Sequence, residues 1–127
     1  MNRFNIDNSI NTDLNIYQCG AENCKSGHSF GPAVRDHFLI HFIISGQGIF
    51  EDGQNEYNLK KGQGFLIYPD IVTYYEADQK NPWNYMWVGF HGLKAESYLK
   101  EAGLTRESPI FSTNNIISLK ECIEKMI

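Results

Sequence analysis

The sequence predicts a mainly β protein: an antiparallel barrel or double-sheet jelly roll followed by two C-terminal helices. Several short apolar runs, separated by Gly, Pro and Asp turns, fill residues 37–91. No helix-length segment lies between these runs, which excludes parallel βαβ units. Beyond residue 92 the apolar residues change from strand to helix spacing, which indicates the two helices.

Length and charge narrow the class of protein. The chain has 127 residues, enough for one domain, and its 42% hydrophobic and 20% charged residues exclude disorder. A net charge of −4 argues against direct binding to nucleic acid or to an anionic membrane. No run approaches a membrane span of about 20 residues, and no signal peptide is present, so we expect a cytoplasmic protein without a membrane partner.

The N-terminal third carries weak signals. Residues 1–15 are polar and rich in Asn, and they are expected to form a flexible arm. Residues 14–19 suit a first short strand. Residues 20–35 contain four turn formers, so we expect a loop with at most one short extended piece.

The barrel strands are predicted from β-branched and aromatic runs. Turn signals separate the runs, among them a tight hairpin at Asp52-Gly53 and a stop at Pro69-Asp70. The predicted strands are residues 37–44, 49–51, 55–59, 65–68, 72–77 and 83–91.

Two helices are predicted after the barrel. The first spans residues 93–102 and stops at Gly103, and residues 106–114 form a connector. The second spans residues 116–127 and is cut short by the end of the sequence, which suggests a fragment. Its apolar stripe is the predicted dimer interface, formed by Ile116, Leu119, Ile123 and Met126.

No motif for catalysis or metal binding is found. The cysteines, Cys19, Cys24 and Cys122, lack zinc-finger spacing, and reduced thiols are favoured over a Cys19–Cys24 disulfide. His37 and His41 share a strand face but lie about 13 Å apart, too far for one ion. No catalytic residue, metal or cofactor is therefore expected.

An aromatic face is the strongest candidate for a binding site. Trp83, Tyr85 and Trp87 alternate along one strand, and Tyr75 shares a face with its neighbours at two-residue spacing. Flat rings with polar tips suit a sugar. The alternative for these side chains is ordinary core packing. The candidate ligand-binding residues are Trp87, Tyr75, Tyr85, Arg35, His28 and His41, although the two histidines also suit ordinary core or loop positions.

Six ordered motifs then carry a resemblance. They are residues 17–20 (YQCG), 28–36 (HSFGPAVRD), 45–48 (SGQG), 62–69 (GQGFLIYP), 74–78 (YYEAD) and 82–92 (PWNYMWVGFHG). Their order and spacing resemble the regulatory domain of AraC-type transcriptional activators. The resemblance implies a cupin-like effector-binding barrel over residues 16–92, and a helical dimerisation segment over residues 93–127. It also implies helix-turn-helix motifs downstream, outside this chain.

The resemblance further implies a small-molecule effector, often a saccharide, with contacts at Tyr75, Tyr85 and Trp87. Some members carry an arginine where this chain has Gly31, and Arg35 is the candidate substitute. The implied partners are a second copy through the C-terminal helices, and DNA only through the missing domain. Two alternatives stay open: a metal-free cupin enzyme, such as a sugar isomerase or epimerase, and a stand-alone carbohydrate-binding module.

Overall fold

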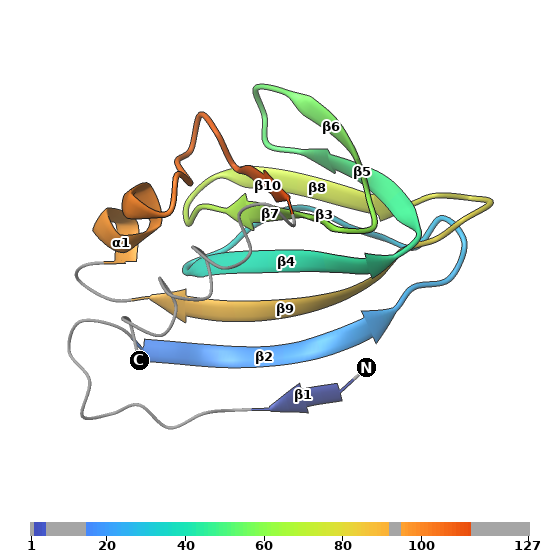
Figure 1. Ribbon diagram of the computed structural model, residues 1–127, viewed down its shortest axis with the longest axis horizontal. Coiled ribbons are helices and arrows are strands. Elements are labelled where there is room, and N and C mark those ends of the chain that lie inside the picture. Colours follow the sequence, from blue (N-terminus) through green and yellow to red (C-terminus); the bar gives the residue numbers. More distant parts are fainter. Residues whose placement is uncertain (1, 5–14, 92–94, 113–127) are drawn as a thin grey trace.

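The computed structural model describes residues 2–4, 15–91 and 95–112 (Figure 1). Its elements are β1 (Asn2–Phe4), β2 (Asn15–Asn23), β3 (Ser29–Val34), β4 (Phe38–Ser45), β5 (Gln47–Glu51), β6 (Glu56–Lys60), β7 (Gln63–Ile67), β8 (Val72–Ala77), β9 (Asn84–His91), α1 (Ala95–Glu101) and β10 (Ile110–Ser112).

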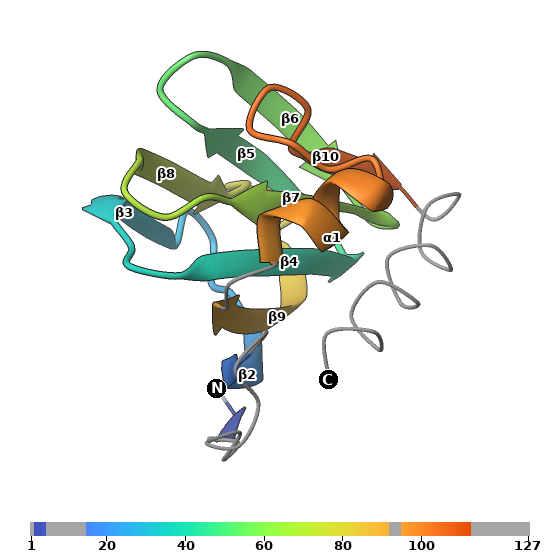
Figure 2. The ribbon, with the colours of Figure 1, turned by 90° about the vertical axis from the view of Figure 1, so that its left-hand side faces the viewer.

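The strands form two sheets. The larger has the order β1-β2-β9-β4-β7-β10, and the smaller has the order β3-β8-β5-β6. All the strand pairs are antiparallel. Figure 2 shows the two sheets facing each other, with α1 beside the larger one. The prediction of a mainly β, antiparallel, double-sheet fold is confirmed.

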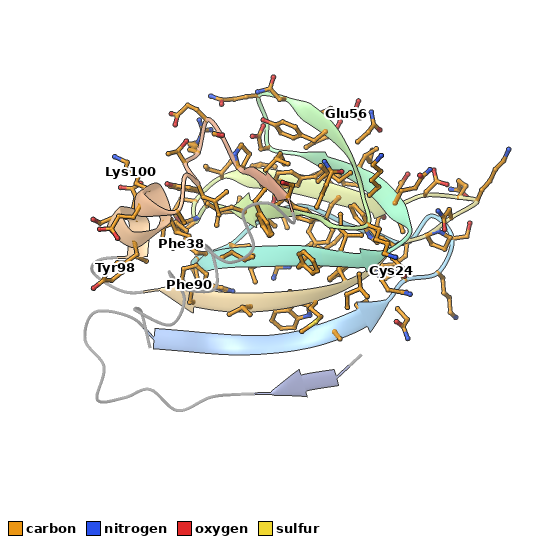
Figure 3. The ribbon with its side chains drawn as sticks, viewed as in Figure 1. Cys24, Phe38, Glu56, Phe90, Tyr98 and Lys100 are labelled. Atoms are coloured by element: carbon orange, nitrogen blue, oxygen red, sulfur yellow. The ribbon has the colours of Figure 1, made fainter. Side chains whose placement is uncertain are left out.

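Apolar residues cover both faces of the larger sheet. Its inner face packs against the smaller sheet, while its outer face packs under α1. Strand β4 therefore begins with four consecutive buried residues, Phe38 to His41, and becomes exposed on its outer face at Ile44. In Figure 3, Phe38 and Phe90 lie near α1, while Cys24 lies toward the opposite end of the sheets.

The N-terminal segments are more ordered than the sequence predicts. Three residues of the expected arm form β1, which pairs with β2, and β2 itself runs to Asn23. In the expected loop, the short extended piece is β3, which pairs with β8. Its register shifts between Phe30 and Ala33, and such an irregularity on an edge strand tolerates Pro32. The turn formers therefore mark an irregular edge strand.

Two further segments differ from the expectation. The predicted connector contains β10, which pairs with β7 and buries Phe111 against Gly64; a Cβ at Gly64 would lie 2.1 Å from the Phe111 ring. The tight turn at Asp52-Gly53 is a four-residue loop instead, because the last strand pair is Glu51 with Glu56. The Asp52 carboxylate accepts the backbone N–H of Gln54 and of Asn55 and so stabilises this longer loop.

The helical segment is confirmed in part. α1 lies within the predicted first helix and buries Ala95 and Leu99. The predicted second helix, residues 116–127, and its dimer stripe lie outside the described residues. Among the described residues, no helix has the length and apolar character needed to cross a membrane.

Candidate ligand-binding site

Strand pairing gathers the predicted site residues on the inner face of the larger sheet. The register aligns Gly20 of β2 with Trp87 of β9, Trp87 with His41 of β4, and His41 with Phe65 of β7. Directly paired residues project from the same face. Trp87, His41 and Phe65 therefore lie side by side in one row on the inner face. Gly20 stands at the end of this row and has no side chain.

His41 occupies the centre of this row. Its imidazole stacks on Phe65 with 4.6 Å between ring centroids and 5° between the planes. Only 2% of its surface is exposed. The ring also meets Tyr85 from the same sheet, at 4.8 Å between centroids. The His41 ring is thus packed between aromatic rings.

Tyr75 brings the smaller sheet into the same cluster. Its side chain points inward from β8, with 4.9 Å between its ring centroid and that of His41, and 6.2 Å to that of Tyr85. Phe30, the direct partner of Tyr75 in the β3–β8 ladder, stacks on Tyr75 with 5.5 Å between ring centroids. We name His41, Tyr75, Tyr85, Trp87 and Arg35 the inner cluster.

Arg35 joins the cluster from the connection between β3 and β4. Its guanidinium carbon lies 4.0 Å from the centroid of the Phe30 ring, a cation–π arrangement. Its Nε atom is buried and has no hydrogen-bond partner among the described residues. A buried donor without a partner is costly, so this atom is available to a ligand.

His41 carries a second buried polar atom without a partner, Nδ1, again within the described part of the chain. Burial, together with the positive charge of Arg35, lowers the pKa of His41 to about 3. The imidazole is therefore neutral at pH 7, with one N–H donor and one acceptor nitrogen. A ligand hydroxyl can form a hydrogen bond with either kind of nitrogen, because a hydroxyl both donates and accepts hydrogen bonds.

Neutral polar groups surround these atoms. Burial raises the pKa of Tyr75, and the Arg35 guanidinium opposes that rise. Burial also raises the pKa of Tyr85, with further contributions from Tyr75, Cys24 and Glu22. The pKa of the Cys24 thiol rises to about 11, first through burial and then through the negative charge of Glu22. Both phenols and the thiol therefore keep their protons at pH 7.

Aromatic packing fills the inner face beside the cluster. Trp83, Phe50 and Phe65 are fully buried. Phe65 stacks on Phe50 at 4.4 Å and on Trp83 at 5.8 Å. Trp83 is thus a core residue. Core packing is the alternative to a binding site that the sequence analysis gives for the aromatic face. Gly48 makes room for this indole, since a Cβ there would lie 2.6 Å from a Trp83 ring carbon.

Some residues depart from the predicted site. The His28 side chain is exposed, so it lies outside the buried cluster. Sequence reasoning missed Glu22, Phe30 and Cys24, which the structure places next to Tyr85 and Tyr75. The inward position of Glu22 follows from its pairing with Tyr85 of β9. Gly20 within β2 and the turn formers that follow this strand concealed its end in the sequence.

Other features are weaker candidates. A hollow of about 500 Å³ lies along β5, β6 and β8, and another of about 430 Å³ lies near the loop after β5. In the part of the chain that the structure describes, neither hollow contains a buried polar side-chain atom without a partner. The same part of the chain contains no group of three His, Cys, Asp or Glu side chains suited to a metal.

Two regulators are similar to this chain in sequence. The Msm operon regulatory protein of Streptococcus mutans is 45% identical over 107 residues, which cover 82% of this chain and 38% of that protein. The raffinose operon transcriptional regulatory protein RafR of Pediococcus pentosaceus is 31% identical over 106 residues, covering 81% of this chain and 38% of RafR. The chain thus spans about two fifths of the length of these relatives.

A solved structure supports the fold. A cupin-like protein from Thermotoga maritima superposes with a TM-score of 0.54 at 16% identity, covering 72% of this chain and 73% of that one. The double-sheet architecture is therefore cupin-like.

The family model of the AraC-like ligand binding domain matches residues 15–127, which include every strand except β1 and every residue of the inner cluster. Because this match extends over most of the sequence, the chain belongs to the family of AraC-like ligand-binding domains.

Proposed function

We propose that this domain binds a saccharide effector in the inner cluster and that binding controls the transcription-regulating activity of a longer protein. The observation that carries the proposal is the pair of buried, unpartnered atoms, Arg35 Nε and His41 Nδ1, within an aromatic cluster. Proteins rarely leave such atoms without partners unless a ligand or water provides them.

The chemistry of the cluster suits a sugar. The C–H faces of a sugar ring pack against aromatic side chains, and its hydroxyls exchange hydrogen bonds with fixed donors and acceptors. Trp87 and Tyr85 provide aromatic surface, while Arg35 and His41 provide nitrogen atoms. The name of one relative, a regulator of a raffinose operon, supports the same class of ligand.

Regulation requires that the ligand favour one arrangement of the whole protein over another. The relatives extend well beyond the length matched here, which leaves room for DNA-binding motifs in a longer chain. A net charge of −4 makes this domain itself poorly suited to DNA, so we assign DNA contacts to that other part. We further propose that the stripe from Ile116 to Met126 forms a homodimer.

A metal-free sugar isomerase or epimerase is the competing function. Such an enzyme needs a general base whose pKa lies near the working pH. His41, with a pKa of about 3, is too weak a base for that role at pH 7. Both relatives are also named as regulators. We therefore favour a binding domain without catalytic activity.

A thermal-shift screen tests saccharide binding. Neutral mono-, di- and trisaccharides, raffinose among them, are added to the protein. A ligand at a hundred times its dissociation constant stabilises the fold by about 2.7 kcal/mol, which raises Tm by several degrees. Trp87→Ala is expected to abolish this rise.

Met86→Ala is the matched control. Met86 is the chain neighbour of Trp87 but faces outward and is 53% exposed, so its loss should leave the Tm shift intact. A panel in which no saccharide raises Tm contradicts the saccharide proposal, as does equal loss of binding in both variants.

A further inference from the structure

Glu22 occupies an inward position that the proposed site has not yet used. Its direct partner in the β2–β9 ladder is Tyr85, which points inward and is 6% exposed. Paired residues share a face, so the half-buried Glu22 side chain projects from the inner face beside the tyrosine. Its negative charge acts on both Tyr85 and Cys24.

No partner satisfies this carboxylate within the described part of the chain. Neither a hydrogen bond nor an ion pair joins Glu22 to another described residue. A partly buried carboxylate prefers several donors, since each oxygen can accept more than one hydrogen bond. The Glu22 oxygens are not among the buried atoms without a partner, so solvent reaches them, and a ligand hydroxyl can take the place of that water.

The neighbouring row explains what could reach these acceptors. Gly20 and Glu22 are two residues apart on β2, opposite Trp87 and Tyr85 respectively. Positions two apart on one strand face are separated by roughly 7 Å, about the width of a sugar ring. A ring lying against Trp87 beside Gly20 would therefore place its edge hydroxyls near Glu22.

The charges around the tyrosine pair cancel. Arg35 acts on Tyr75 from one side, and Glu22 acts on Tyr85 from the other. His41 is neutral at pH 7 because its pKa is about 3, and the Cys24 thiol is neutral because its pKa is about 11. Of these named groups, Arg35 carries one positive charge and Glu22 one negative charge, so an uncharged ligand matches them better than an anion does.

We propose that Glu22 determines specificity: its carboxylate accepts hydrogen bonds from vicinal hydroxyls of an uncharged saccharide, and it excludes sugar acids. This inference rests on the proposed saccharide-binding function and narrows it to neutral sugars. Charge-assisted hydrogen bonds are roughly twice as strong as neutral ones, so the carboxylate gives both affinity and discrimination.

The test compares Glu22→Gln with Glu56→Gln. Glu56 lies on β6, is exposed, and is far from Cys24 in Figure 3, yet its substitution changes the net charge equally. Both variants and the wild type are titrated calorimetrically with raffinose, and with the pairs galactose and galacturonate, and glucose and glucuronate. Within each pair only the C6 group differs.

The wild type is expected to bind a neutral probe at least tenfold more tightly than its acidic counterpart. Glu22→Gln should weaken binding of the neutral probe about fivefold to tenfold, and it should reduce the discrimination against the acid. Glu56→Gln should match the wild type. Without ligand, Tm of Glu22→Gln should be unchanged or higher, because no partner within the protein is lost.

Three outcomes overturn the assignment. They are unchanged affinity for a neutral probe in Glu22→Gln, tighter binding of a sugar acid by the wild type, and a lower Tm of the ligand-free variant, which would indicate a structural role. In each of these cases the saccharide site can remain valid. If no probe binds to the wild type, the proposed function fails, and this inference fails with it.

Discussion

At the scale of single residues, His41 shows how burial changes chemistry. Exposed histidine titrates near pH 6.5, but the His41 ring is enclosed by Phe65, Tyr75 and Tyr85 and lies near the charge of Arg35. Protonation would place a second positive charge in this apolar space. The residue therefore stays neutral over the physiological range.

This environment gives a pH-dependent stability. Because the folded pKa of His41 is about 3, the unfolded chain takes up the proton first as pH falls below about 6.5. The stability from neutral His41 is thus complete above that pH and is lost progressively toward pH 3. Between pH 7.5 and pH 5.0, His41 should account for a fall of about 2 kcal/mol in the free energy of unfolding.

Urea unfolding of His41→Phe at the two pH values measures this fall. The variant keeps an aromatic ring against Phe65 and should show a pH dependence smaller by about 2 kcal/mol. His28→Gln is the control, because His28 is exposed, and it should behave as the wild type. A variant with the full wild-type pH dependence would show that another group is responsible.

At the scale of elements, the C-terminus of α1 follows from sequence almost directly. The Leu104 N–H donates to the Leu99 carbonyl at 2.9 Å, and the Gly103 N–H donates to the Lys100 carbonyl at 2.9 Å. This pair of bonds is a Schellman motif, with Gly103 in the left-handed region at φ 83°. Leu104 and Leu99 also pack together in the core under the helix.

Gly103→Ala tests the motif without a steric complication. No atom lies within 4 Å of the position that a Cβ would occupy, so the cost arises from the backbone conformation alone. The free energy of unfolding should fall by about 1 kcal/mol, and less for Gly103→Asn, since Asn tolerates this conformation better. Equal stability of Gly103→Ala and the wild type would argue against the left-handed cap.

Prediction from sequence succeeded where the signal is local. The run from Phe38 to Ile44, the alternation from Trp83 to Trp87 and the stop at Gly103 each contain the pattern of their own element. β10 could not be found in this way, because its three residues become a strand only by pairing with β7. The strength of such pairing depends on distant partners.

The same distinction between local signals and pairing with distant strands applies to the residues of the candidate site. Tyr75, Tyr85 and Trp87 were identified from alternation within their own strands. Glu22 required the β2–β9 register, and Phe30 required the pairing of β3 with Tyr75. Neither relation can be obtained from sequence, because Gly20 interrupts the pattern of β2, and Gly31 and Pro32 give β3 the composition of a loop.

At the scale of the whole molecule, binding and association are assigned to different regions. The inner cluster lies between the sheets, whereas the proposed dimer stripe lies in residues 116–127. The chain spans 38% of the length of each of two relatives. In the proposed function, the rest of a longer protein would add contacts that this domain does not make by itself. Association of the 127-residue chain alone should therefore be weak.

Sedimentation at several protein concentrations tests this assignment. A dissociation constant in the micromolar range or above is expected, corresponding to about −8 kcal/mol or weaker. Leu119→Glu should abolish any dimer, since it places a charge in the apolar stripe, while the CD spectrum of the barrel should not change. A tight dimer that survives this substitution would place the interface on the sheets.

The central claim, that a saccharide binds against Trp87 on the inner face, is tested most directly by NMR of the two tryptophan indoles in the wild-type protein. Trp87→Phe assigns the two N–H signals. On titration with a neutral saccharide that raises Tm, the account predicts that the Trp87 signal moves and saturates with the calorimetric Kd. A Trp87 signal that stays in place while calorimetry shows binding would contradict the account and place the ligand elsewhere.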